Sequence, residues 1–172
     1  MQIQLSADDV SALMALLPAG AAALNSGFAY DGEALFVPPE HEAAVSAIFA
    51  VPDWQDSAAK AALVAYAADR RRRLQVGGIV VAGVPVATDD HSKLMIVGAR
   101  VAAMADPGWS TVWHGADGAT YPVDATAMVA ISDEVQAHVN AGFVTFASVK
   151  AAIEAGTITT TAEIDLAFGA SA

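Results

Sequence analysis

The sequence contains no cysteine, which excludes disulfide bonds and metal sites built on thiolates. This absence fits synthesis in a reducing cytosol. Aromatic residues make up only 7% of the 172 positions, and alanine supplies much of the apolar content. Such a composition suits closely packed helices more than a core of bulky side chains. The length is that of one ordinary domain, or of a small domain that carries an appendage.

Long hydrophobic runs are also missing. No apolar stretch reaches the roughly 18 residues that a membrane-spanning helix needs. The segment at the start of the chain, Met1 to Ser6, lacks the basic start and the apolar stretch of a signal peptide. With 55% hydrophobic and 16% charged residues, the composition is that of a folded protein and not of a disordered one. We therefore expect no membrane partner.

Basic residues are scarce, at eight Lys and Arg against nineteen Asp and Glu, for a net charge of −11. None of the eight precedes Ser57, whereas eight of the acidic residues do. An acidic surface repels phosphate backbones, so we expect no nucleic-acid partner. The uneven charge either keeps an alanine-rich chain soluble or forms an acidic N-terminal segment that docks on a basic partner.

The segment before Ser57 contains the signals of a helix, a hairpin and a second helix. Ser6, followed by two aspartates, is a typical helix N-cap. Asp31-Gly32 between apolar segments predicts a hairpin turn, because such turns need positive φ angles. Pro38-Pro39 then opens a short helix. We assign residues 1–56 as an N-terminal adaptor segment.

The predicted hairpin of this segment carries three large apolar residues, Phe28, Leu35 and Phe36. A two-stranded hairpin is only marginally stable on its own. Exposed apolar side chains on such a hairpin indicate a contact with another protein. We therefore expect these three residues to be exposed and to bind a partner, in a chain that forms a homo- or hetero-oligomer.

Residues 57–172 are predicted to form a helix-rich domain with short hairpins, because no long βαβ alternation is present. In chain order the expected elements are a helix from Ala58 that ends at Gly77-Gly78, a hairpin over 79–86, a helix after Thr88-Asp89-Asp90, a hairpin over 109–123 that turns at Asp117-Gly118, a helix capped by Asp124 that stops near Gly142, and a last helix over 143–156. The tail from Thr157 is ambiguous between strand and loop. The fold class of the whole chain is therefore α+β.

Four consecutive arginines, Arg70 to Arg73, supply half of the basic residues. Successive helical side chains step by about 100°, so four in a row surround the helix and cannot form one flat anion-binding face. Asp69 is spaced to pair with Arg73. Arg70 lies on the apolar side of the helix, where an arginine is normally paired. We expect Arg70 to bind a carboxylate, with Asp89 or Asp90 the candidates by sequence order.

The segment that starts at Thr88 contains Asp89, Asp90 and His91. Small polar residues ahead of an apolar helical run are typical helix caps, which gives Thr88 and Asp89 a structural role. The alternative is a small metal-dependent hydrolase that uses Asp89, Asp90 and His91. The other histidines lack the spacing of metal ligands. We therefore expect no metal, no cofactor and no catalytic residue.

One succession of motifs resembles a known family. From Val64 to Gly156 the chain carries a basic helix, a Gly-Gly pair, a short hairpin, a capped helix, a tryptophan with an Asp-Gly hairpin, and a helix pair. The matching positions are Arg70, Arg73, Gly77-Gly78, Gly83, Thr88-Asp89, Ser92, Gly98-Ala99, Trp113, Asp117-Gly118, His138-Val139 and Phe143. Their order and spacing resemble an uncharacterised family of small domains found mainly in tailed bacteriophages and prophages.

This resemblance implies a non-enzymatic virion protein. Members of that family look like tail, tail-fibre or fibre-assembly proteins, and no catalytic residues are known for them. The chain is therefore expected to be a component of a tail, baseplate or tail fibre, made in the host cytoplasm and partnered by other tail proteins. In this interpretation Trp113 is a structural residue beside a hairpin turn. The alternative is a tail-fibre assembly chaperone that is not retained in the particle.

Overall fold

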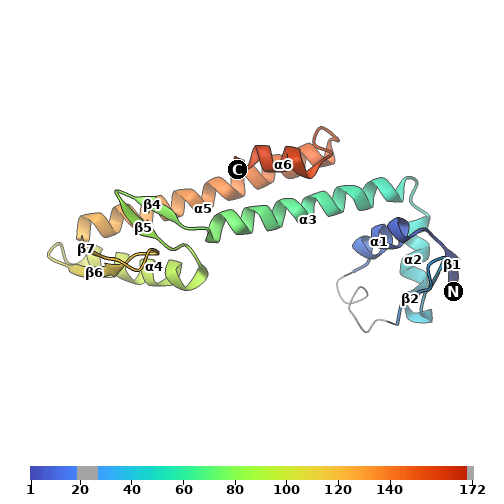
Figure 1. The fold of residues 1–172 in the computed structure, drawn as a ribbon, viewed down its shortest axis with the longest axis horizontal. Helices are drawn as coiled ribbons and strands as arrows, with labels where there is room; N and C mark the ends of the chain where they lie inside the picture. Colours follow the sequence, from blue (N-terminus) through green and yellow to red (C-terminus); the bar gives the residue numbers. More distant parts are fainter. Residues whose placement is uncertain (19–26, 170–172) are drawn as a thin grey trace. The chain divides into compact units, whose positions relative to one another are not determined.

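The computed structural model describes residues 1–18 and 27–169, and it confirms the predicted α+β class (Figure 1). The chain divides into two compact units. Unit 1 comprises Met1–Tyr66 and Ile153–Thr160, and unit 2 comprises Ala67–Ala152 and Thr161–Ala172. Two long helices, α3 (Trp54–Val76) and α5 (Ala125–Glu154), contribute residues to both.

Unit 1 is a small antiparallel sheet with short helices. Its elements before α3 are β1 (Gln2–Gln4), α1 (Ala7–Leu16), β2 (Ala29–Tyr30), β3 (Ala34–Phe36), the 3₁₀ helix η1 (Pro39–His41) and α2 (Glu42–Phe49). The strand order is β1-β3-β2. The first strand was not predicted from the sequence, and it turns the expected two-stranded hairpin into a three-stranded sheet.

Local polar signals set the predicted turns of unit 1. The Ser6 hydroxyl accepts a hydrogen bond from the Asp9 amide at 3.1 Å and so caps α1. The Asp31 carboxylate accepts from the amides of Glu33 and Ala34 at 3.0 and 2.8 Å, and Gly32 has a φ of 102°. The predicted helix start and hairpin turn are confirmed.

Leu35 is not exposed, which corrects the predicted partner contact of the hairpin. It lies in the central strand, pairs with Ile3 and Tyr30, and is only 1% exposed. Because β1 supplies a third strand, the sheet can bury this side chain in a core of its own unit. That core consists of Leu13, Leu17, Leu35, Val37, Val45 and Trp54. Phe36 is 50% exposed, and Phe28 is partly buried and stacks on the His41 ring at 5.1 Å.

Unit 2 consists of helices separated by two-stranded hairpins, as predicted. Its further elements are β4 (Ile79–Val81), β5 (Val84–Val86), α4 (Asp90–Ala105), β6 (Ser110–His114), β7 (Thr120–Asp124) and α6 (Thr161–Ala167). In the β4–β5 turn Ala82 and Gly83 have positive φ angles of 48° and 84°, which matches a hairpin turn of two left-handed residues. The Asp124 carboxylate accepts from the Ala127 amide at 2.8 Å, as expected of a cap for α5.

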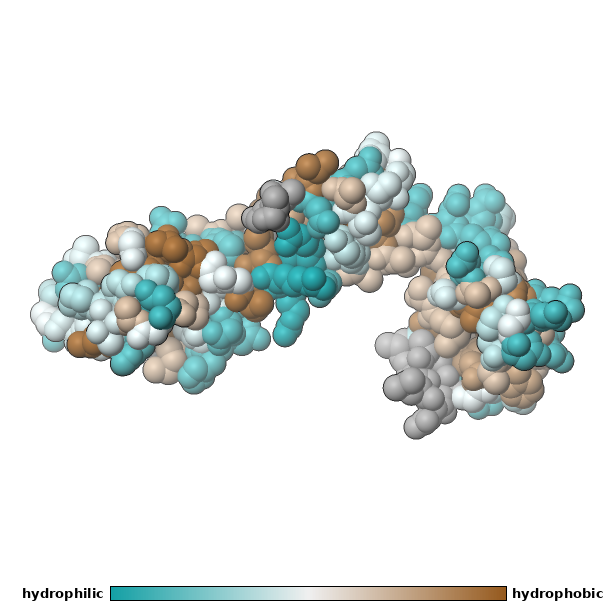
Figure 2. Space-filling model, viewed as in Figure 1, coloured by the Kyte–Doolittle hydropathy of each residue, from teal (hydrophilic) through white to brown (hydrophobic). Residues whose placement is uncertain are grey.

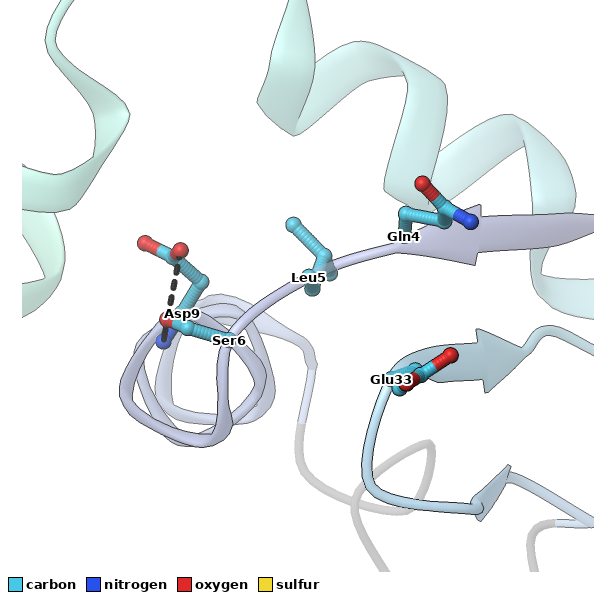
Figure 3. Close-up of a pocket in the computed structure, with 5 residues that line it drawn as sticks. All are labelled: Gln4, Leu5, Ser6, Asp9 and Glu33. Carbon is cyan, nitrogen blue, oxygen red and sulfur yellow. Dashed lines mark hydrogen bonds between the residues drawn. The ribbon is translucent and has the colours of Figure 1, made fainter.

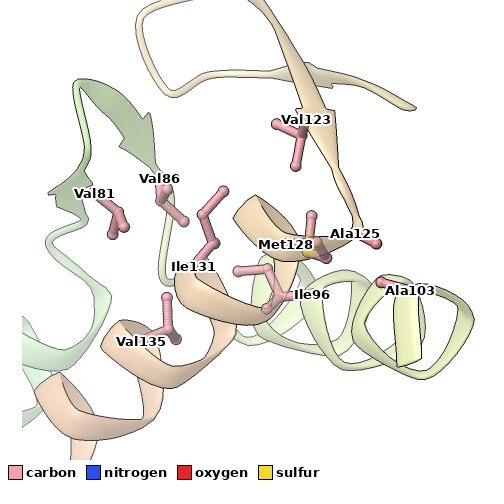
Figure 4. Close-up of a cluster of buried hydrophobic side chains, with 9 residues drawn as sticks. All are labelled: Val81, Val86, Ile96, Ala103, Val123, Ala125, Met128, Ile131 and Val135. Atoms are coloured by element: carbon pink, nitrogen blue, oxygen red, sulfur yellow. The ribbon is translucent and has the colours of Figure 1, made fainter. Parts of the chain in front are cut away.

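The core of unit 2 lies where both hairpins and α4 meet α5 (Figure 4). Its buried members are Val81, Val86, Ile96, Ala103, Val123, Ala125, Met128, Ile131 and Val135. The hairpins and α4 each contribute one or two side chains, whereas α5 contributes four. Both hairpins and α4 therefore pack against the same face of α5.

Gly142 does not end a helix, which corrects the predicted helix pair. The helix α5 runs through it without a break for 30 residues. No proline follows, and a single glycine costs a long helix only about 1 kcal/mol relative to alanine. Gly142 lies beside α3, where an added Cβ would be 3.5 Å from Gln75 Cγ and 3.6 Å from Arg71 Cγ.

The ambiguous tail contains the short helix α6. Its Ile164 is fully buried, and the following Phe168 is also buried. Seven residues with one buried apolar position give too short a periodic pattern to separate helix from strand. Packing in unit 2 therefore decides the conformation of this segment.

Replacing Gly142 by alanine should stabilise the protein. Alanine gains about 1 kcal/mol of helix propensity over glycine, and the new Cβ would sit at ordinary van der Waals distance from its nearest neighbours. We expect a higher melting temperature for Gly142→Ala and a lower one for Gly142→Leu, measured by circular dichroism. A Gly142→Ala variant that melts below the parent chain would contradict a continuous, evenly packed α5.

Candidate functional site

The helix α4 starts at a polar cap that the sequence predicted. The Asp89 carboxylate accepts from the Ser92 amide at 3.0 Å and from the Ser92 hydroxyl. Thr88 is fully buried, and its hydroxyl accepts from the Gly78 amide at 2.9 Å. Thr88 therefore ties the start of α4 to the end of α3, and Asp89 alone is the cap.

The three residues of the hydrolase alternative are arranged as a helix N-terminus. The Ser92 hydroxyl and amide hold the pKa of Asp89 below its ordinary value. A hydrogen bond and ion pair with Lys93, at 2.8 Å, lower the pKa of Asp90. His91 is exposed. Over residues 1–18 and 27–169, no group of three or more His, Asp and Glu side chains is placed to hold a metal ion.

The helix α4 is apolar on two opposite faces. Ile96 and Ala103 point into the core of unit 2. The exposed side of the helix carries four large apolar side chains that are between 56% and 68% exposed. We call these residues, Leu94, Val97, Val101 and Met104, the α4 seam. Contiguous exposed apolar surface of this kind is typical of a protein-binding site.

A groove separates α4 from the strand β6 beside the α4 seam. Its volume is about 580 Å³, and apolar surface dominates its lining. It is lined by His91, Ser92, Leu94, Met95, Gly98, Ala99, Trp109, Thr111, Val112, Trp113 and His114. Thr111 to His114 are consecutive residues of β6, and all four line the groove. The groove therefore runs along the strand, and Trp113 forms part of its wall.

The β6–β7 hairpin that forms one wall of the groove is fixed in two ways. At its predicted turn, the Asp117 carboxylate accepts from the Ala119 amide at 3.0 Å and from the Tyr121 hydroxyl at 2.7 Å. The Tyr121 hydroxyl lowers the pKa of Asp117, and the same bond raises the pKa of Tyr121. The Ala116 amide donates to the Pro85 carbonyl at 2.9 Å, which joins the hairpin to β5.

Hydrophobic residues reach the surface on the face of the molecule that Figure 2 shows. Outside the α4 seam, unit 2 has other exposed apolar side chains. Val80 in β4 is an example, at 70% exposed. Single exposed residues of this kind are ordinary in proteins. The α4 seam differs because four such residues follow one another on one helix.

Arg70 does not bind Asp89 or Asp90, which corrects the predicted pairing. Its Nε lies 3.0 Å from Oδ1 of Asp165, in the helix α6. The sequence pattern of this segment is ambiguous between strand and loop, so it gives no signal that Asp165 faces Arg70. The predicted pair of Asp69 and Arg73 is confirmed at 2.7 Å.

The guanidinium group of Arg71 packs on two aromatic rings. Its guanidinium carbon lies 4.5 Å from the ring centre of Phe143 and 5.2 Å from that of Phe146. A guanidinium over aromatic faces is attracted by the ring quadrupole. This arginine therefore packs α3 against α5 and is not part of an anion-binding patch.

Unit 1 has a smaller depression that is lined mainly by polar residues (Figure 3). Gln4, Leu5, Ser6, Asp9 and Glu33 surround it. Figure 3 shows the Ser6 and Asp9 side chains bonded to each other, and this bond belongs to the cap of α1. The depression is thus a consequence of how α1 starts.

The sequence contained the α4 seam but not its exposure. All four residues are apolar positions of the helix predicted after Thr88-Asp89-Asp90, and apolar helix positions usually face the core. The available signal was that Leu94 and Val101 lie on the opposite side of a helical wheel from Ile96 and Ala103. A helix that is apolar on two sides must either be enclosed or present one side to solvent.

Comparison with known proteins identifies the larger part of the chain. Residues 58–168 match the model of a domain of unknown function, DUF4376. The chain belongs to the DUF4376 family. The DUF4376 region includes α4, both hairpins of unit 2 and α6. No curated protein and no solved structure matches the chain. Within the residues that the structure describes, no helix is both long and apolar enough to cross a membrane.

The Asp89 cap should make part of the stability of the DUF4376 domain depend on pH. A carboxylate with a lowered pKa stabilises the folded state above the ordinary aspartate pKa of about 4, and this contribution is lost as pH falls through the lowered value. Asp89→Ala should therefore have a lower melting temperature than the parent chain at neutral pH. The difference between the two melting temperatures should become smaller as the pH is lowered. Asp89→Asn retains a cap oxygen and should melt closer to the parent. A difference in melting temperature that does not change with pH would exclude this role of the carboxylate.

The pair of Arg70 and Asp165 should contribute about 1 kcal/mol, because both side chains are partly exposed. We expect Arg70→Ala to lower the free energy of unfolding, and Arg72→Ala, at an exposed position, to have little effect. A double-mutant cycle with Asp165→Asn isolates the pair from other effects. Coupling indistinguishable from zero would show that the pair adds no stability.

Proposed function

We propose that this chain is a non-enzymatic structural protein of a tailed bacteriophage or prophage, placed in a tail, baseplate or tail fibre. In this proposal the DUF4376 domain is a protein-binding module. The observation that carries it is the exposed α4 seam with the adjoining groove. The phage context rests on the order of motifs between Arg70 and Phe143, which resembles that of tail-associated domains.

The carboxylates at the start of α4 and at the β6–β7 turn are bonded within the chain, which supports binding more than catalysis. Asp89 is engaged by Ser92, Asp90 by Lys93 and Asp117 by Tyr121. A general acid at neutral pH needs a raised carboxyl pKa, and the pKa of each of these three groups is lowered, which argues against that one catalytic role. The groove itself is mainly apolar, which suits a protein side chain better than a charged substrate.

The N-terminal segment, residues 1–56, is proposed as the adaptor to another tail protein. It carries eight acidic residues and no lysine or arginine. Its apolar core ends at Trp54 and shares no residue with the core of unit 2. A basic partner surface would therefore recognise this segment by charge, and added salt should weaken the attachment.

The second candidate is an assembly chaperone of a tail fibre. An exposed apolar helix face would serve a chaperone as well as a structural protein. The two differ in whether the chain remains in the finished particle. Mass spectrometry of purified particles separates them, because a structural component is recovered in defined copy number and a chaperone is lost.

A truncated chain that starts at Ser57 tests both the proposed function and the adaptor. It retains the complete core of unit 2, so we expect a cooperative thermal melt. The full chain should be found in purified particles by mass spectrometry, and the truncated chain should be absent from them. The control is Arg72→Ala in the full chain, which should be incorporated as the parent is.

Two results would count against this proposal. Aggregation of the truncated chain would show that the segment before Ser57 belongs to the same folding unit as the rest. Particles that lack the full chain would exclude a structural role and leave the chaperone role.

A further inference from the structure

We propose that the α4 seam binds the α4 seam of a second copy of this chain, with the two helices antiparallel. This inference goes beyond the proposed function, because the pairing requires no other tail protein. It rests on the spacing of the seam, the charges that flank it and the space at Gly98.

The spacing of the seam indicates that its occupant is a helix. Leu94, Val97, Val101 and Met104 are separated by steps of three, four and three along the sequence. Apolar residues at this alternation of three and four form the contact line of paired helices, in which each side chain enters a hole on the facing helix. A strand would need alternate residues at a spacing of two.

The charges favour a second copy as the occupant. The chain carries a net charge of −11, so identical copies repel one another overall. The seam is different, because Lys93 pairs with Asp90 and Arg100 pairs with Asp133 within the same chain. Its flanks are therefore neutral. Along these flanks an identical copy meets no net like charge, and no unpaired charge selects a partner of opposite sign. At the N-terminal end of the seam line, however, Asp90 is still 81% exposed although it pairs with Lys93.

An antiparallel arrangement fits the ends of the seam. It places Leu94 opposite Met104 of the second copy, and Val97 opposite Val101. A parallel arrangement in register would place Asp90 opposite its own copy, because Asp90 lies one heptad before Val97 on the same line. The antiparallel arrangement moves each aspartate beyond the end of the facing helix.

Gly98 lies beside the centre of the seam and lets the two backbones approach. A Cβ added at Gly98 would meet no atom within 4 Å in the single chain, so the space next to this residue is open. Small residues at a helix contact permit close packing of the main chains. In the antiparallel pair the two glycines lie near the two-fold axis.

The size of the seam sets the expected strength. From Leu94 to Met104 it extends roughly 16 Å along the helix, and Met95 and Val112 continue the exposed apolar surface beside it. A stable interface usually buries about 1,200–2,000 Å² in total. The seam should bury an area at the low end of this range, so we expect weak pairing. Its test must therefore span concentrations from roughly 1 to 200 μM.

Sedimentation of the full chain over this range tests the pairing. The parent chain should pass from monomer to dimer as concentration rises. Val101→Glu places a charge in the seam and should remain monomeric throughout. The matched control is Val80→Glu, a similarly exposed valine in β4, which should dimerise as the parent does. Thermal melts of both variants establish that they are folded. A parent that stays monomeric, or a Val101→Glu variant that still dimerises, would overturn the proposal.

Cysteine cross-linking tests the direction of the helices, because the chain has no cysteine of its own. Leu94→Cys and Met104→Cys chains are mixed and oxidised, and the disulfide products are separated by mass. Random oxidation of an equal mixture gives as much mixed disulfide as the two same-residue disulfides together, so an antiparallel pair predicts that the mixed disulfide exceeds their sum. A majority of same-residue disulfides would overturn the antiparallel arrangement. Failure of either test leaves incorporation into particles, and with it the proposed function, unaffected.

Discussion

The packing of α4 and the two hairpins onto one face of α5 is the constraint on which unit 2 depends. Met128, Ile131 and Val135 form its centre, and each neighbouring element adds only one or two buried side chains. Such a core is small for the number of elements that it holds. It can enclose one side of α4, through Ile96 and Ala103. Among the residues that the structure describes, no element covers the other side.

The exposed side of α4 therefore follows from the size of the core. Four large apolar side chains on one exposed helix side form a surface that is typical of an interaction site, and they are separate from the core positions Ile96 and Ala103. The charged residues beside them are already paired within the chain. Burial of the seam by another helix would therefore leave no unpaired charge in the interface, and association would not incur the desolvation cost of such a charge.

Local signals in the sequence were sufficient for caps and turns and insufficient for contacts between distant segments. Asp89, Asp124 and Asp31-Gly32 act on amides two or three positions away, so their roles could be predicted. The burial of Leu35 depends on β1, at the very start of the chain. The partner of Arg70 lies 95 positions later. Gly142 was wrongly predicted to end a helix, because packing of α5 against α3 holds the helix through this residue. The α4 seam was visible as a pattern, but its exposure depends on what the rest of unit 2 leaves uncovered.

The two regions proposed for binding differ in their physical character. The N-terminal segment offers acidic side chains and has no lysine or arginine, so its attraction to a partner would be electrostatic and screened by salt. The α4 seam offers apolar side chains with neutral flanks, so its association would be driven by removal of apolar surface from water, which salt does not screen. A chain with both surfaces can join its own copies through one and a different protein through the other, and neither contact competes with the other for the same residues.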